Sequence, residues 1–269
     1  MTVLQAVLLG VVQGLTEFLP VSSTAHLLII PHYLGWPDPG AAFSAAIQLG
    51  TLAAVFVYFA GDIKRLSGAA IEGLRHRNLR HTPDSLIAWS IIPATIPIGV
   101  LGLGLSDFIE TEFRSLAVVA SALIALALFL LVAERRGKRT REMGQLRFWQ
   151  VQVIGFCQAL ALIPGCSRSG STIMGGLFCG LRRSEAARFS FVLGLPAIGA
   201  SGLLKLIELI ETQPPGEGLL SLAAGIVAAA ISGYLSIGFL LRFLERHGTY
   251  WFAYYRICLG LFILSGLYL

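Results

Sequence analysis

The feature that most constrains this chain is a hydrophobic run that is broken at its end by proline, glycine and an arginine. No charged residue lies between Arg147 and Arg168, a stretch long enough to cross a bilayer, yet it ends in Pro164-Gly-Cys-Ser-Arg-Ser-Gly-Ser-Thr172. A helix facing lipid would not accommodate that sequence. Proline removes a backbone donor and glycine relaxes the helix, so we expect the chain to turn back here, surrounded by protein or water.

This predicted turn gathers groups that suit a phosphate. Backbone N–H groups, serine and threonine hydroxyls and the guanidinium of Arg168 would point to one place. The alternative is a kinked helix whose Arg168 snorkels to the membrane interface. Because arginines within the membrane are usually functional, we favour the phosphate-binding interpretation.

Composition identifies an integral membrane protein of several helices. Hydrophobic residues make up 55% of the 269 positions and charged residues 13%, so we expect one membrane domain covering 1–269, with no soluble domain. The start of the chain lacks the basic region and cleavage site of a signal peptide. The four cysteines have no metal-binding spacing, and we expect small core residues. The net charge of +5 lies in short loops, so no nucleic-acid partner is expected.

A second broken stretch opens the chain. Glu17 follows sixteen uncharged residues, and prolines at 20, 31 and 37 predict two short helices around a turn at 20–23. Three membrane spans are then expected. The polar segment 62–84 is predicted to be a loop that could carry an interfacial helix, and a short acidic turn is expected at 107–112. The three predicted spans of this half are 39–61, 85–106 and 115–133.

The second half repeats this order. The broken stretch 148–180 precedes three more spans, and Gln158 lies nine positions before Ser167, as Gln13 lies nine before Ser22. The predicted spans are 186–209, 218–241 and 250–268. The fold class predicted is therefore an all-α polytopic membrane protein of two inverted repeats, each a broken re-entrant helix pair plus three transmembrane helices. Three spans per half is an odd number, so the halves have opposite orientations. Their boundaries are 1–134 for repeat 1, 135–147 for a basic connector and 148–269 for repeat 2.

The basic residues predict the orientation. Four short segments carry 16 of the 20 lysines and arginines, and in this topology all four lie on one side, which is expected to be cytoplasmic. The segments are 62–84, 135–147, 182–188 and 242–249. The acidic residues of the opposite turns are Asp38, Asp107, Glu110, Glu112, Glu208, Glu211 and Glu217. The two broken stretches then enter from opposite sides, and their turns meet in the membrane interior.

The two turns together offer an acid, a base, hydroxyls and a cation. Gln13 and Glu17 share a helix face, and His26 lies within reach of the Ser23 hydroxyl as its base. Glu17 would orient the histidine or hold a divalent ion, and Arg168 would neutralise phosphoryl oxygens. Each residue alone has an ordinary structural explanation, such as helix capping by the serines. The conjunction favours a phosphatase.

Two motifs resemble a known family. Gln13-Gly-Leu-Thr-Glu-Phe-Leu-Pro-Val-Ser-Ser-Thr-Ala-His26 is similar to the first signature of the bacterial undecaprenyl-pyrophosphate phosphatases of the BacA type, and 164–172 resembles their second. The resemblance implies hydrolysis of undecaprenyl pyrophosphate to the monophosphate and inorganic phosphate, recycling the lipid carrier for cell-wall synthesis and conferring bacitracin resistance. It also implies a divalent cation (Mg2+ or Ca2+), the bacterial plasma membrane, and a site that faces the outer side.

Carried over by position, the resemblance implies a set of site residues. Catalytic roles fall to Glu17, Ser23, His26 and Arg168, with Ser23 as nucleophile, His26 as its base, and a phosphohistidine at His26 left open. Position 13 is Gln rather than a second carboxylate, so a metal would bind to Glu17 with pyrophosphate oxygens or water as its other ligands. The predicted substrate-binding residues are Gln13, Ser22, Gly165, Ser167, Ser169 and Thr172.

A transporter or flippase of a phosphate-bearing lipid is the competing function. Inverted repeats with broken helices are a common transporter architecture. A purely structural scaffold is hard to reconcile with Glu17, His26 and Arg168 in interrupted helices. The expected partners are a polyprenyl pyrophosphate and membrane lipids, and the sequence leaves open whether the protein forms a homodimer.

Overall fold

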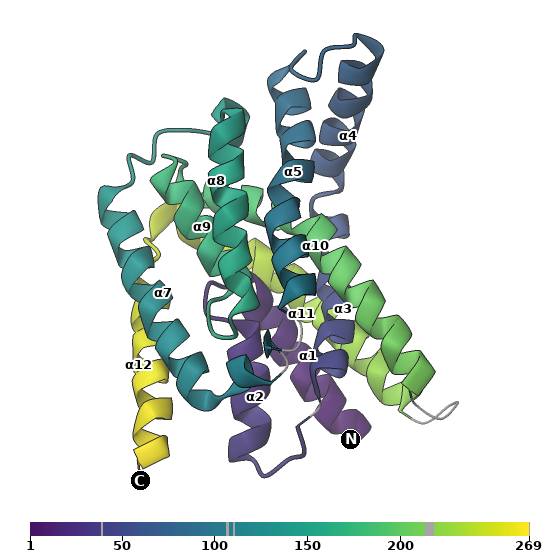
Figure 1. The fold of residues 1–269 in the computed structure, drawn as a ribbon, viewed down its shortest axis with the longest axis vertical. Coiled ribbons are helices and arrows are strands. Elements are labelled where there is room, and N and C mark those ends of the chain that lie inside the picture. The colour runs from purple at the N-terminus through teal and green to yellow at the C-terminus, as the bar shows by residue number, and fades with distance from the viewer. Residues whose placement is uncertain (39, 106–107, 110, 213–217, 269) are drawn as a thin grey trace.

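The computed structural model is mainly helical over the residues it describes, which are 1–269 except 39, 106–107, 110, 213–217 and 269. Within these ranges one isolated backbone bridge, between Arg141 and Leu181, is the sole pairing of strand type. Both termini lie at the same end of the molecule (Figure 1). The helices are α1 (Val3–Phe18), α2 (Ser23–Tyr33), α3 (Gly40–Tyr58), α4 (Ala60–Arg75), α5 (Pro83–Gly104), η1 (Glu112–Arg114), α7 (Leu116–Arg136), η2 (Met143–Gln145), α8 (Phe148–Ala159), η3 (Leu160–Leu162), α9 (Arg168–Phe178), α10 (Arg183–Thr212), α11 (Leu219–Arg246) and α12 (Tyr250–Tyr268).

Both predicted breaks are confirmed. Helix α1 ends at Phe18, and α2 begins at Ser23, so the first turn falls at 19–22 as Pro20 indicated. In the second stretch α8 and the short η3 end at Leu162, and α9 begins at Arg168. Each broken stretch is therefore a pair of short helices. We refer to 19–22 as turn 1 and to 163–167 as turn 2.

The long apolar helices make this a multi-pass membrane protein. Among the described residues, α5, α7, α10, α11 and α12 each carry a segment long and apolar enough to cross a membrane. A sixth span results if Phe43–Tyr58 and Ala60–Arg75, which bend by 76° at their junction, count as one. These helices correspond to the six predicted spans. Of the predicted acidic turns, Asp107, Glu110 and Glu217 lie outside the described residues.

Segment 62–84 contains a helix, which the sequence prediction of a loop with an interfacial helix allowed. Most of it belongs to α4, which runs to Arg75 and packs against α5. The helix is fixed by Leu66, which is buried against the core, and by the buried Asp62, which accepts from Arg188 of α10 at 2.6 Å.

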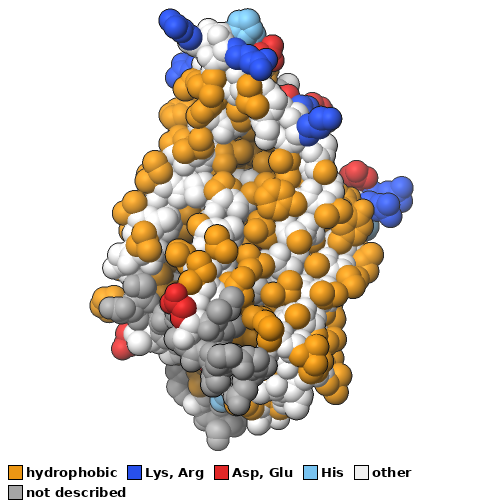
Figure 2. Space-filling view, turned by 90° about the vertical axis from the view of Figure 1, so that its right-hand side faces the viewer, with side chains coloured by type: hydrophobic (Ala, Val, Ile, Leu, Met, Phe, Trp, Pro, Cys, Tyr) orange, Lys and Arg blue, Asp and Glu red, His pale blue; other side chains and the backbone are white. Residues whose placement is uncertain are grey.

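The core sits where the broken helices meet the long ones. Helix α1 packs against α11, α3 lies against α10 and α11, α5 against α8, and α7 against α12, as Figure 1 shows for the last pair. The outer flank is largely apolar, and lysines and arginines gather toward one end of the face in Figure 2. Large apolar side chains such as Phe156, Val227 and Leu235 are exposed on the surface of the protein. In a membrane these surfaces face lipid rather than water.

A buried carboxylate joins the helices at the basic end. Glu134, fully buried near the end of α7, accepts from Arg183 at 2.5 Å and Arg139 at 2.8 Å through one oxygen. Its other oxygen accepts from the backbone N and the hydroxyl of Thr249, at 3.1 and 2.8 Å. One buried carboxylate therefore links the end of α7 to the starts of α10 and α12.

Candidate active site

Glu17 joins the two turns. Its Oε2 accepts from Gln13 Nε2 at 2.9 Å and from Ser23 Oγ at 2.7 Å, and its Oε1 pairs with Arg168 Nη2 at 2.9 Å. The carboxylate is 6% exposed, so the ion pair lies within the protein. The predicted meeting of an acid from the first stretch with the arginine of the second is thus present in the structure.

The helices that leave the two turns begin in the same way. Ser22 caps α2 with a φ of 74°, and Ser167 caps α9 with a φ of 63°. Their hydroxyls accept from the backbone N of Ala25 at 3.4 Å and of Gly170 at 3.1 Å. Helix N-termini carry free N–H groups and a partial positive charge, which favour a bound anion. Two such ends face the interior here.

The guanidinium of Arg168 has hydrogen-bond donors that no protein group accepts from. One nitrogen of its guanidinium pairs with Glu17, whereas Nε and Nη1 are buried and have no hydrogen-bond partner. The group lies directly over Gly194 of α10, where a Cβ would overlap Nη1. Glycine is therefore required at 194 for the guanidinium to occupy this place. Buried donors without a partner suit an anionic ligand.

The remaining predicted substrate-binding residues of the second stretch divide into two groups. Ser169 Oγ donates to the Leu19 carbonyl of turn 1 at 3.1 Å and lies 3.1 Å from Ser167 Oγ, so these hydroxyls are at the junction. Thr172 instead bonds the Arg168 carbonyl at 2.8 Å and the Ser190 hydroxyl, which ties α9 to α10.

Gly165 supports turn 2 through its backbone. Its φ is +99°, a value that side chains other than glycine rarely adopt, and a Cβ would overlap the Val119 carbonyl of α7. The structure therefore gives this predicted site residue a clear part in shaping the turn.

The structure does not contain the Ser23–His26 contact that the sequence spacing predicted. Ser23 donates to Glu17, while His26 uses Nδ1 toward the Ser22 carbonyl at 2.7 Å and Nε2 toward the Tyr255 hydroxyl at 2.6 Å. Since a carbonyl only accepts, Nδ1 carries the proton in the neutral ring and Nε2 accepts from Tyr255. Within the first turn of α2, the imidazole contacts the backbone carbonyl of Ser22 instead of the Ser23 hydroxyl. Glu17 is therefore the base nearest to Ser23.

Sequence reasoning did not assign Gln158 and Tyr255 to the site. Gln158 is fully buried, and both polar atoms of its amide lack a partner, as does Oε1 of Gln13. The equal spacing of Gln13 and Gln158 before their serines was a usable signal for the second glutamine. Tyr255 lies far along the chain in α12, and no local pattern pointed to it.

The comparisons with known proteins agree with one another. The family described as "Bacitracin resistance protein BacA" matches residues 6–262. The chain belongs to the BacA family. Its relatives include proteins named "Undecaprenyl-diphosphatase" from Chloroherpeton thalassium, 50% identical over 99% of this chain and 97% of the relative, and from Myxococcus xanthus, 49% identical over 98% and 89%. A third, of the same name, from Thermomicrobium roseum is 46% identical over 98% of both chains.

Gln13 and Glu17 carry oxygen atoms of the kind that bind a divalent cation, the cofactor that the sequence resemblance implies. Gln13 Oε1 is buried without a partner, on the same amide whose Nε2 donates to Glu17 Oε2. Carboxylate and amide oxygens are the ligands that Mg²⁺ and Ca²⁺ prefer. The two residues would hold such an ion together with phosphate oxygens and water. A separate group, Glu72, His76 and His81, places three ligating atoms within 4.8 Å of one another, but it is exposed.

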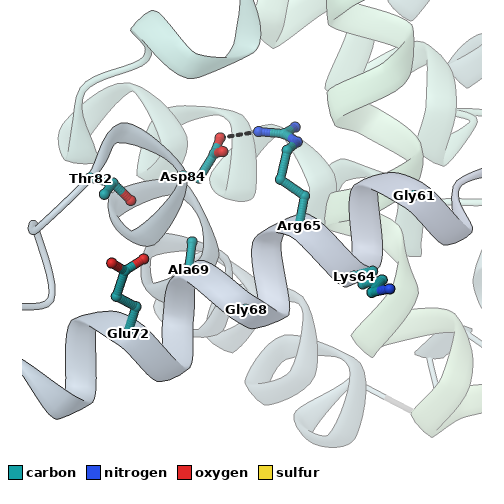
Figure 3. A pocket seen from close by; sticks show the side chains of 8 residues that line it. All are labelled: Gly61, Lys64, Arg65, Gly68, Ala69, Glu72, Thr82 and Asp84. Atoms are coloured by element: carbon teal, nitrogen blue, oxygen red, sulfur yellow. Dashed lines mark hydrogen bonds and ion pairs between the residues drawn. The ribbon is translucent and has the colours of Figure 1, made fainter.

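An open cleft of about 520 Å³ lies away from this site, along α4 and the start of α5 (Figure 3). Its arginine, Arg65, is paired with Asp84, as the dashed line shows, and with Asp62 at 3.2 Å. Glu72 lines the same cleft. Because the carboxylates offset its basic side chains, this cleft does not suit a pyrophosphate.

Proposed function

We infer that this protein is a membrane phosphatase that hydrolyses undecaprenyl pyrophosphate to undecaprenyl phosphate and inorganic phosphate. Membership of the BacA family, with relatives named undecaprenyl-diphosphatase, gives the reaction. The structural observation that carries it is the Glu17–Arg168 ion pair, with Ser23 on the same carboxylate. Removal of the pyrophosphate-bearing lipid recycles the carrier for the cell wall. It also removes the target of bacitracin, which accounts for resistance.

We propose that the fold consists of two inverted repeats, 1–134 and 148–269. The support is the common order of elements in each half and the serine caps with positive φ that start α2 and α9. With the basic loops in the cytoplasm of a bacterium, the two broken pairs would enter from opposite faces. The site would open to the outer side, where the polyprenyl tail stays between helices in lipid while the charged head enters.

In the reaction proposed here, Ser23 attacks the terminal phosphorus and Glu17 takes the hydroxyl proton. A bond forms between Ser23 Oγ and phosphorus, and the bond from phosphorus to the bridging oxygen breaks, which releases undecaprenyl phosphate. Water then cleaves the phosphoserine to give inorganic phosphate and regenerate the serine. Arg168, through its free donors, neutralises the phosphoryl oxygens, which is the main requirement for phosphoryl transfer.

His26 offers a second route to a covalent intermediate. Its Nδ1 is held by the Ser22 carbonyl, so Nε2 is the nitrogen that would receive a phosphoryl group. That route requires the Tyr255 hydroxyl to leave Nε2 first. A divalent cation held by Gln13 and Glu17 would supply further positive charge to the pyrophosphate oxygens in either route.

Phosphate release in detergent tests the function. Purified protein should release inorganic phosphate from undecaprenyl pyrophosphate, and Arg168→Ala should lower the rate by about 10³-fold or more. Lys64→Ala, which removes a basic side chain from the cleft in Figure 3, is the matched control and should leave the rate unchanged. If the wild-type protein releases no phosphate, the broken helices would instead favour lipid transport, which needs an intact membrane.

A further inference from the structure

Among the residues that the structure describes, Arg256 of α12 is the largest fully buried side chain, at 0% exposed, and it contacts both turns at once. Its Nη1 donates to the Pro20 carbonyl of turn 1 at 3.2 Å. Its Nη2 donates to the Gly165 carbonyl of turn 2 at 2.8 Å and to that of Cys166 at 3.3 Å. One guanidinium therefore fastens the two turns to each other.

The same side chain also joins the two turns to helix α7. Its Nε donates to the Leu123 carbonyl of α7 at 3.2 Å, and Nη2 also lies 3.5 Å from the Ala122 carbonyl. Helix α12 packs along α7, whose far end is fixed by the buried Glu134. The relative position of the turns is thus set by an arginine outside both broken stretches.

The charge of Arg256 has no carboxylate partner within the described part of the chain. All five of its acceptors are backbone carbonyls, which are neutral. The carboxylate of turn 1, Glu17, already pairs with Arg168. An isolated buried charge is strongly unfavourable unless hydrogen bonds and an opposite charge compensate for it. Within the described residues, the two turns therefore contact two guanidinium groups but one carboxylate. One positive charge is left without a negative partner.

We propose that Arg256 is a positioning residue which locks the two turns together and whose uncompensated positive charge favours the pyrophosphate anion between them. This inference rests on the proposed function. The side chain acts through the turns, since the carbonyls of Pro20, Gly165 and Cys166 occupy its donors. Its Nη1 lies next to Gly170 in the first turn of α9, so the charge adds to the positive end of that helix.

The test compares Arg256→Gln and Arg256→Lys with Arg246→Gln, which removes an exposed arginine from the end of α11 as a matched control. Arg256→Gln should lower kcat/KM for undecaprenyl pyrophosphate at least about 100-fold. Arg256→Lys keeps the charge but not the forked donors, so it should recover part of the loss, while the control should match wild type.

A second readout separates anion binding from folding. Inorganic pyrophosphate should raise the melting temperature of wild type and of Arg246→Gln, and should raise it less for Arg256→Gln. Equal kcat/KM and equal pyrophosphate stabilisation in Arg256→Gln and wild type would overturn the inference. So would a variant that melts earlier but keeps full activity below its melting temperature, because that result indicates a structural role alone.

The outcomes also separate this inference from the proposed function. Lack of phosphate release by the wild-type protein refutes the phosphatase itself, whereas an active wild type with an equally active Arg256→Gln refutes only the role of Arg256. Should Arg256→Gln fail to fold, Arg256→Lys decides the matter. A folded lysine variant with wild-type kinetics and wild-type pyrophosphate stabilisation would contradict the need for the forked contacts to both turns.

Discussion

Gly194→Ala should reduce activity by displacing Arg168 without unfolding the protein. A Cβ at 194 would overlap Nη1 of Arg168, and the three nearest atoms all belong to that guanidinium. The side chain must therefore shift by on the order of an ångström or more, and a misplacement of that size costs about 100-fold in rate. This corresponds to about 2.7 kcal/mol of transition-state stabilisation. Replacing glycine inside α10 also gains up to about 1 kcal/mol of helix propensity, which offsets part of the strain.

The assay is phosphate release from undecaprenyl pyrophosphate by the purified variant in detergent, alongside its thermal unfolding. Gly199→Ala is the matched control, because in the same helix its Cβ would meet only Leu52 Cδ2, at an ordinary 3.7 Å. A double variant with Arg168→Ala should be no slower than Arg168→Ala alone, since the displaced group is then absent. A folded Gly194→Ala protein with wild-type kcat/KM would refute the placement of Arg168 over α10.

Four further outcomes follow from the site. Tyr255→Phe frees His26 Nε2, which the Ser23–Glu17 route does not use, so kcat for phosphate release should stay unchanged, and a rise in kcat would instead favour His26 as the nucleophile. Gly165→Ala must adopt a positive φ, and thermal unfolding should show a loss of about 2 kcal/mol. Ser23→Ala should lower kcat by about 10⁴-fold, and near-normal phosphate release would instead assign the nucleophile to His26 or water. EDTA should abolish turnover until Mg²⁺ or Ca²⁺ is added, and Gln13→Ala should raise the cation concentration required for half-maximal rate.

The breaks in the helices could be predicted because their causes are local. Pro20 and Pro164 interrupt apolar runs, and the opposite entry of the two broken stretches predicted that the turns beside Glu17 and Arg168 meet. The structure places the two together. Spacing along the chain was sufficient for the breaks, because each depends on a few neighbouring residues, whereas the approach of Glu17 to Arg168 followed from the expected meeting of the two turns.

Contacts between distant segments could not be predicted in this way. Ser23 was expected to face His26 because three residues separate them, but the geometry of α2 turns the imidazole to the Ser22 carbonyl. Arg256 was visible as a charge in the last span, yet its link to both turns depends on how α12 packs against α7. Packing of this kind sets partners that no local pattern specifies.

The serines that cap α2 and α9 carry a cost in stability. Ser22 and Ser167 hold a backbone geometry that glycine tolerates easily, at a strain on the order of 1–2 kcal/mol for each. Replacing a capping serine by glycine costs only a few tenths of a kcal/mol of capping energy, so glycine at either position should raise the free energy of unfolding. Selection for heat resistance alone would thus tend to remove these two hydroxyls. Their presence suggests that catalysis, rather than robustness, sets the identity of both residues.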